Sequence, residues 1–153
     1  WNDTIFKLTV IYAVSDTSNV YAAFSQGCRS GGFSIRGILA EFLPYDPENV
    51  DSWEVGSKNE FLDGRMRLNL AAFVNILQNA QFSSVLTDQQ TPGSPGTNTL
   101  VNNAKGDIEI RGLEAELTAV LSDGLSLIVT AGYQDDKSDR FQISSRRVIF
   151  NQV

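Results

Sequence analysis

The reactive side chains of this 153-residue chain offer little from which a catalytic or metal site could be built. The sequence has no histidine, so a conventional Ser-His-Asp triad is excluded. Cys28 is the only cysteine, which excludes an internal disulfide and a zinc site of the usual ligands. Asp135, Asp136 and Asp139 form an acidic cluster without the glycine and distal glutamate of an EF-hand loop. We therefore expect neither an enzyme nor a metal or cofactor site.

Charged residues recur instead within segments that are otherwise rich in apolar residues. Alternate residues of a β-strand project to the same face, so we expect these charges to line one polar face. Glu54 and Lys58 would be roughly 13 Å apart along a strand, too far for a direct pair. Glu60 and Arg67 would face each other across a tight turn, and the alternative is that all these charges are merely solvated. The set comprises Arg29, Glu54, Lys58, Glu60, Arg67, Glu114 and Glu116.

The elements that would position these charges show a hydrophobic period of two. The clearest is residues 66–77, where the even positions hold Met66, Leu68, Leu70, Ala72, Val74 and Ile76. Residues 6–14 and 125–134 repeat the alternation. A period of two over this length predicts β-strands with one apolar face.

Three short polar segments predict tight turns between these strands, at residues 15–19, 63–64 and 122–124. Register can be tested because a slip of one residue would move every side chain to the other face. Each turn matches apolar residues with apolar residues. The expected pairs are Phe61 with Met66 and Glu60 with Arg67; Leu121 with Leu125, Ala119 with Leu127 and Leu117 with Val129; and Val14 with Val20, Tyr12 with Ala22 and Val10 with Phe24.

The connections at the other end of the strands are long and polar, about residues 30–51 and 86–103. Short turns at one end, long loops at the other and strands of about ten residues are typical of transmembrane β-barrels. No apolar run approaches the roughly 20 residues of a transmembrane helix. The net charge of −6 argues against a nucleic-acid partner.

Two local points remain open. Ile108 and Ile110 lie on even positions whereas Leu113 and the apolar residues after it lie on odd ones, which predicts either a β-bulge near Arg111-Gly112 or two inward-facing isoleucines. Residues 113–121 and 46–55 also carry helix-forming signals, although both segments are short.

Three blocks of sequence resemble the TonB-dependent receptors of Gram-negative outer membranes. They are VYAAFSQGCRSGGF at residues 20–33, DPENVDSWEVGSK with FLDGR at residues 46–65, and NAKG with IRGLEAEL and GLSL between residues 103 and 127. Cys28 stands where the family pattern has an aromatic residue. Val153 stands where a complete barrel would end in an aromatic residue, so we expect a piece of a longer protein.

The resemblance implies an all-β antiparallel up-and-down meander of about six strands, a section of a large transmembrane barrel of about 22 strands. The expected hairpins are about residues 5–29, 51–85 and 104–137, without the plug domain. The implied function is uptake of a scarce ligand, such as a ferric siderophore, a vitamin or an oligosaccharide, energised by TonB acting through the plug. The implied surroundings are the lipid of the outer membrane. The charged face would then line the lumen and help to hold the plug.

Ligand capture would fall to the long loops. The first loop mixes aromatic and cationic groups able to hold an amphiphilic ligand: Phe33, Arg36, Phe42 and Tyr45. Two rivals remain open, a passive porin-type barrel and a soluble β-sandwich binding module. Strand alternation alone does not separate these classes.

Overall fold

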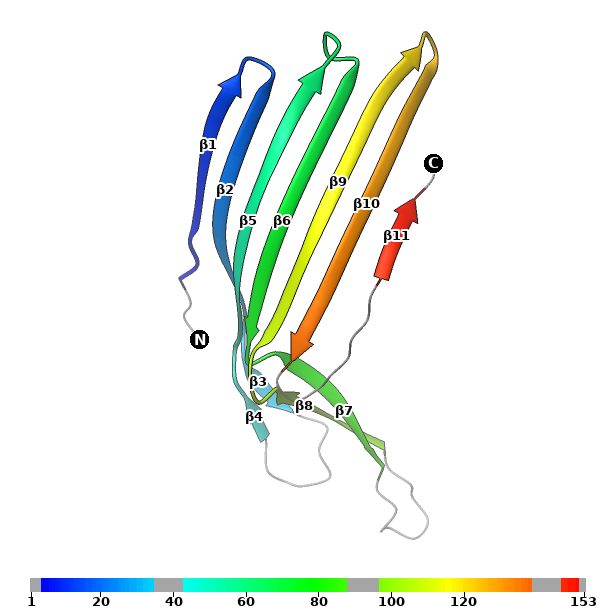
Figure 1. Ribbon diagram of the computed structural model, residues 1–153. Coiled ribbons are helices and arrows are strands. Elements are labelled where there is room, and N and C mark those ends of the chain that lie inside the picture. Colours follow the sequence, from blue (N-terminus) through cyan, green and yellow to red (C-terminus); the bar gives the residue numbers. More distant parts are fainter. Residues whose placement is uncertain (1–3, 35–42, 88–96, 139–146, 152–153) are drawn as a thin grey trace.

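Most of the chain forms one curved antiparallel sheet. The computed structural model describes residues 4–34, 43–87, 97–138 and 147–151. Seven strands pair in the order β1-β2-β5-β6-β9-β10-β11, each with its neighbour along the meander (Figure 1). Two small sheets, β3-β4 and β7-β8, lie at the loop end. The main-sheet strands are β1 Lys7–Ser15, β2 Ser18–Arg29, β5 Glu48–Phe61, β6 Met66–Gln78, β9 Ile108–Ser122, β10 Leu125–Ser138 and β11 Arg147–Asn151.

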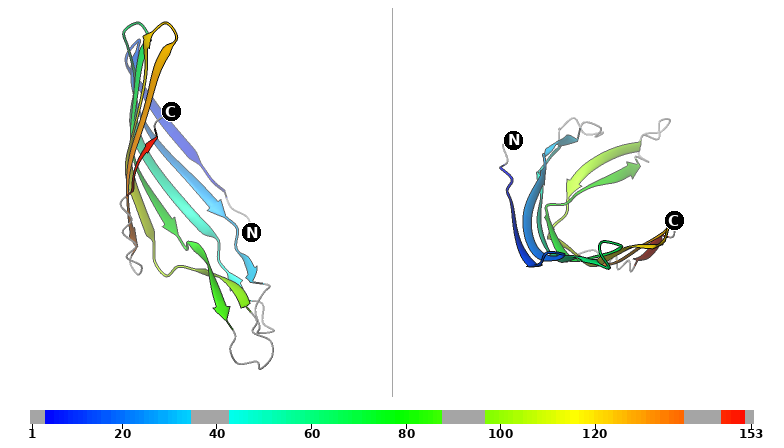
Figure 2. Two further views of the ribbon diagram at one scale, coloured as in Figure 1. Left: turned by 90° about the vertical axis from the view of Figure 1, so that its right-hand side faces the viewer. Right: turned by 90° about the horizontal axis from the view of Figure 1, so that it is seen from above.

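The predicted meander is confirmed, with six long strands and a short seventh. Viewed from above, the main sheet is an open arc (Figure 2). The described strands thus form a curved single wall, so the β-sandwich alternative is wrong for this part of the chain. No helix that could span a membrane occurs among the described residues.

The central hairpin has the predicted register, with Phe61 opposite Met66 and Glu60 opposite Arg67. Asp63 and Gly64 have φ values of 56° and 81°, and the Arg65 amide donates to the Leu62 carbonyl over 3.1 Å. Leu62 also has a positive φ, of 54°, so the loop comprises residues 62–65 and is longer than the predicted two-residue turn. Asp63 and Gly64 suit its two central positions, where a type I′ turn requires positive φ.

The other two hairpins require corrections. In the first, Ser15 pairs with Ser18, and an irregularity between Ala13 and Ser15 places Tyr12 opposite Val20. The predicted pairs Val14–Val20, Tyr12–Ala22 and Val10–Phe24 are therefore wrong by two residues, because the turn is tighter than the expected five-residue loop. A shift of two keeps every side chain on its predicted face.

In the third hairpin the predicted pairs Ala119–Leu127 and Leu117–Val129 are confirmed. Leu125 pairs with Ser122 instead of Leu121, because the register shifts between Leu125 and Ser126. The turn is therefore Asp123-Gly124, with φ of 86° at the glycine.

Strands β9 and β5 resolve the two local questions left open by the sequence. Its pairing with β6 and β10 runs without a shift through Arg111 and Gly112, so the bulge there is wrong. Ile108 and Ile110 simply occupy the same face as Gly112. The helical alternatives for residues 113–121 and 46–55 are also wrong, since residues 113–121 lie in β9 and residues 48–55 lie in β5.

The register divides the main sheet into an apolar face and a polar face. On β6 the apolar face runs from Met66 to Ile76, about 33 Å along the strand and about 25 Å in height at a tilt of about 40°. That height matches the apolar band of an outer-membrane barrel. The apolar face includes Leu8, Val10, Tyr12, Val20, Phe24, Trp53, Val55, Leu70, Val74, Leu113, Leu127, Val129 and Tyr133.

An aromatic cluster marks one border of the apolar face. The ring centroids of Phe6 and Phe24 are 5.7 Å apart, and those of Phe24 and Trp53 are 4.3 Å apart. One row closer to the loops, the same face turns polar, with Gln26 donating to Asp51 over 3.0 Å. Aromatic residues between an apolar band and a polar rim are typical of the membrane interface of such barrels.

The long connections contain small hairpins of their own. Strands β3 (Gly32–Ser34) and β4 (Leu43–Tyr45) pair in the first connection, and β7 (Gln81–Thr87) and β8 (Thr97–Asn103) pair in the second. The β7-β8 hairpin leans toward the hollow side of the arc (Figure 2). The second connection therefore begins at Asn79, seven residues before the expected start at Leu86. Asn79 has a φ of 53°, which turns the chain away from β6.

Candidate functional site

The polar face of the sheet gathers the charged residues that the sequence grouped together. Cross-strand pairing places Arg29, Glu54, Lys58, Glu60, Arg67, Glu114 and Glu116 on this one face. Glu54 and Lys58 share the face without a direct ion pair. That this face lines a lumen, and that the seven residues act there, stays a prediction.

Tyr21 links Glu54 and Lys58, although the sequence pattern does not single it out. Its hydroxyl donates to Glu54 Oε1 over 2.7 Å, and Lys58 Nζ lies 5.8 Å from the centre of its ring. Gly56 makes this possible, because a Cβ atom there would lie 2.6 Å from the ring of Tyr21. The ring therefore lies flat against the wall while its hydroxyl reaches the carboxylate.

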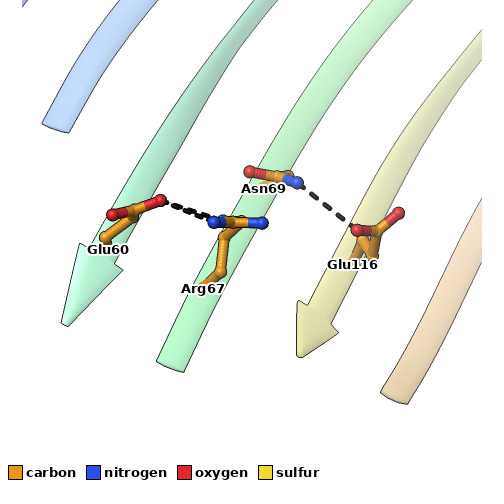
Figure 3. A network of polar contacts seen from close by, with 4 residues as sticks. All are labelled: Glu60, Arg67, Asn69 and Glu116. Atoms are coloured by element: carbon orange, nitrogen blue, oxygen red, sulfur yellow. Dashed lines mark hydrogen bonds and ion pairs between the residues drawn. The ribbon is translucent and has the colours of Figure 1, made fainter. Parts of the chain in front are cut away.

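The predicted pair of Glu60 and Arg67 forms beside the tight turn (Figure 3). Glu60 Oε1 accepts from Arg67 Nε over 3.0 Å and from Nη2 over 2.8 Å. Their side chains are 42% and 56% exposed, so we assign the pair only about 0.2 to 1 kcal/mol. It satisfies both charges and leaves neither in need of another partner.

The neighbouring part of the polar face is rich in acceptors and poor in donors. Asn69 Nδ2 donates to Glu116 Oε1 over a long 3.4 Å (Figure 3). The buried Asn69 Oδ1 has no hydrogen-bond partner, and Glu114 has no hydrogen bond or ion pair among the described residues. A hollow of about 340 Å³ opens here, lined among others by Tyr21, Glu54, Lys58, Asn69, Glu114 and Glu116. Such a surface suits a partner that brings cationic donors.

The predicted ligand-facing residues are only partly placed. Phe33 on β3 is 58% exposed. Tyr45 on β4 is half-buried, and a Cβ at its cross-strand partner Gly32 would lie 2.6 Å from its hydroxyl. Arg36 and Phe42 lie outside the described residues, so all four remain predictions.

The two described members of the acidic cluster, Asp135 and Asp136, lie on opposite faces of β10. Asp135 Oδ2 accepts from Arg111 Nη2 over 3.3 Å on the apolar face, whereas Asp136 follows it on the opposite face. Asp139 lies outside the described residues. Among the residues that the structure describes, no group of three His, Cys, Asp or Glu could hold a metal ion.

Two amide side chains that the sequence did not single out join the bases of the two long connections. Asn103 exchanges two hydrogen bonds with the backbone of Asp46: its Oδ1 accepts from the amide over 2.7 Å, and its Nδ2 donates to the carbonyl over 2.9 Å. Gln81 Nε2 donates to the carbonyls of Ser30 and Asp46 over 3.0 and 3.1 Å. In the sequence, the only feature that could have pointed to Asn103 and Gln81 is their position at the base of a long connection.

A comparison with protein families agrees with this two-faced wall. The family described as TonB dependent receptor-like, beta-barrel, matches residues 1–149. The chain belongs to this family. Among curated TonB-dependent relatives, it is 27% identical over 131 residues to the ferric-pyoverdine 358 receptor of Pseudomonas putida, covering 85% of this chain and 14% of that receptor. It is 28% identical over 123 residues to the ferripyoverdine receptor of Pseudomonas aeruginosa, covering 80% and 14%.

Solved TonB-dependent receptor structures share the fold. The ferric yersiniabactin uptake receptor FyuA of Yersinia pestis superposes with a TM-score of 0.68 at 21% identity, covering 90% of this chain and 19% of that one. The alcaligin outer membrane receptor FauA of Bordetella pertussis gives 0.63 at 20% identity, covering 95% and 25%. The chain thus spans about a seventh of the length of the two pyoverdine receptors.

Proposed function

We propose that this chain is a section of the wall of a Gram-negative outer-membrane receptor that takes up a scarce ligand with energy supplied through TonB. The observation that carries the proposal is the division of one curved sheet into an apolar band of membrane height and a charged opposite face. A passive porin-type barrel would have the same two faces, so the test must distinguish TonB-dependent uptake from passive diffusion.

The apolar face would lie against the lipid of the outer membrane. The exposed aliphatic and aromatic side chains support this, because a sheet face such as that formed by Leu70, Val55 and Leu113 has no cover within the described chain. Leaving this face in contact with water would be unfavourable by about 25 cal/mol for each Å² of apolar surface. Lipid tails remove that cost without any protein partner.

The polar face would hold the N-terminal plug domain of the full-length protein. Glu114, Glu116 and the Asn69 carbonyl supply acceptors without enough donors, which favours lysine or arginine side chains on the facing plug surface. Glu60 and Arg67 already satisfy each other and would contribute less. TonB itself would act through the plug and not touch this wall.

The long connections would face the ligand outside the cell. The relatives named above are receptors for ferric pyoverdine, and another relative is a metal-pseudopaline receptor of Pseudomonas aeruginosa, 27% identical over 130 residues. These names favour a metal chelate over a vitamin or an oligosaccharide. Phe33, Arg36, Phe42 and Tyr45 would supply aromatic and cationic contacts to an amphiphilic chelate. We propose no catalytic role for any residue.

The test uses the natural full-length receptor in a host that lacks other receptors for the chelate supplied. Accumulation of radiolabelled iron as ferric pyoverdine is measured in cells with and without TonB. We expect uptake only when both the receptor and TonB are present. Uptake that persists without TonB would favour the porin-type barrel. No TonB-dependent uptake across a panel of ferric siderophores, vitamin B12 and oligosaccharides would contradict the proposal.

A further inference from the structure

The bases of the two long connections are joined by hydrogen bonds at two separate places. At the first, Asn103 and Gln81 of the second connection bind the backbone around Asp46 in the first. Glu48 Oε2 adds a contact there, accepting from the Gln81 amide over 2.6 Å. These bonds connect strand β8 and the start of β7 to the chain between β4 and β5.

The second junction lies deeper and involves Ser34 at the end of β3. Ser34 is buried, with only 7% of the residue exposed. Ser34 Oγ accepts from the Val101 amide over 2.9 Å and donates to the Val101 carbonyl over 3.2 Å. One hydroxyl therefore satisfies both backbone groups of a residue in the other hairpin. Buried backbone groups left without partners are costly, which makes this junction hard to open.

The corner that starts the second connection is part of the same arrangement. Asn79 has a φ of 53°, and its carbonyl accepts from Asn103 Nδ2 over 2.8 Å. Ala80 is only 7% exposed, and its carbonyl accepts from the Ala104 amide over 2.8 Å. The side-chain nitrogen of Asn103 thus donates to two carbonyls: that of Asn79, where the chain turns away from β6, and that of Asp46 in the first connection.

We infer that Asn103, Gln81 and Ser34 are positioning residues that make the β3-β4 and β7-β8 hairpins one mechanical unit, so that opening either hairpin opens the other. Two independently mobile loops would need no bonds between their bases, whereas here four side chains, those of Asn103, Gln81, Ser34 and Glu48, bridge them. Coupling between two elements is reciprocal in free energy, so it must be detectable from both sides. The consequence that a ligand held by one hairpin also orders the other rests on the proposed function.

The test is hydrogen–deuterium exchange of the full-length protein without ligand, so it can succeed or fail independently of the uptake experiment. Asn103→Ala and Gln81→Ala perturb the β7-β8 side, and the readout is exchange at residues 32–34. Ser34→Ala perturbs the β3 side, and the readout is exchange at residues 82 and 83. Asp46, Val101 and the Gln81 amide are left out of the readout because their bonds bear directly on the substitutions.

We expect exchange in the opposite hairpin to rise roughly ten- to a hundred-fold, as the loss of two or three net hydrogen bonds implies. Gln78→Ala is the matched control. Gln78 lies three residues before Gln81 and is exposed, and its side-chain amide makes no hydrogen bond among the described residues. It should leave both hairpins unchanged, and protection within β6 should persist in every variant. A rise confined to the substituted hairpin, or an equal rise in Gln78→Ala, would overturn the inference.

Discussion

Replacing Gly112 by alanine should destabilise the wall through a clash that the register makes unavoidable. A Cβ at Gly112 would lie 2.6 Å from Phe73 Cζ on β6 and 2.6 Å from the Tyr133 carbonyl oxygen on β10. The ring of Phe73 therefore occupies the space that a side chain would need. Because the neighbours on both sides are held in a continuous ladder, they cannot move apart locally.

Gly132 provides a matched control on the same face of the next strand. A Cβ there would have only the Leu113 carbonyl oxygen within reach, at 3.9 Å. Both substitutions remove the glycine's excess entropy in the unfolded chain, a gain of about 0.5 to 1 kcal/mol that cancels between them. The overpacking penalty of about 1 to 3 kcal/mol falls on Gly112→Ala alone. The two variants should therefore differ in unfolding free energy by about 1 to 3 kcal/mol.

The assay is reversible urea unfolding of the full-length barrel in lipid vesicles, followed by tryptophan fluorescence and by heat-modifiable electrophoretic mobility. Gly112→Ala should lower the urea midpoint with an unchanged m-value, whereas Gly132→Ala should keep or raise it. In a Phe73→Ala background the cost of Gly112→Ala should fall, because the ring is gone and only the backbone contact remains. Equal midpoints for the two alanine variants would refute the register-based reasoning.

Three further predictions use the same unfolding assay. Leu70→Arg, on the apolar face near the middle of the band, should cost about 2 to 4 kcal/mol. Ala71→Arg, one residue further and on the polar face, should cost much less, and equal costs would contradict the assignment of the faces. A double-mutant cycle with Glu60→Ala and Arg67→Ala should give a coupling of about 0.2 to 1 kcal/mol that weakens with salt; a coupling above about 2 kcal/mol would mean that the pair is shielded from water. Gly64→Ala should cost about 1 kcal/mol although a Cβ there meets nothing within 4 Å, because φ is 81°; no loss would argue against the type I′ turn.

The sequence was sufficient to predict the strands of the central hairpin and the face on which each of its side chains lies. Every even position from Met66 to Ile76 is apolar, and a turn centred on Asp63-Gly64 places Phe61 opposite Met66, as the structure has it. The first hairpin was placed two residues out because residues 15–19 are all acceptable in a turn, and composition does not say which of them pair. The side chains were still assigned to the correct faces, because the register error is two residues and side chains alternate between faces with a period of two.

Contacts between strands that are distant in the sequence could not be predicted in this way. Tyr21 meets Glu54 only through the register of β2 with β5, and the long first connection between them sets no register of its own. The break between β6 and β7 also escaped, because Gln78, Asn79, Ala80 and Gln81 include neither glycine nor proline. Asn79 adopts a positive φ there, and its carbonyl accepts a hydrogen bond from Asn103, 24 residues later in the chain. The sequence alone does not indicate this contact.

The most direct test of the two-faced membrane wall is a spin-label scan of residues 66–76 in the full-length protein in lipid. Cys28, the only cysteine of this chain, is first replaced by serine. Labels at Met66, Leu68, Leu70, Ala72, Val74 and Ile76 should collide with oxygen dissolved in the lipid. Labels at Arg67, Asn69, Ala71, Phe73 and Asn75 should be shielded from it. A period of two with this phase is the predicted result, and uniform accessibility or the reverse phase would contradict the account.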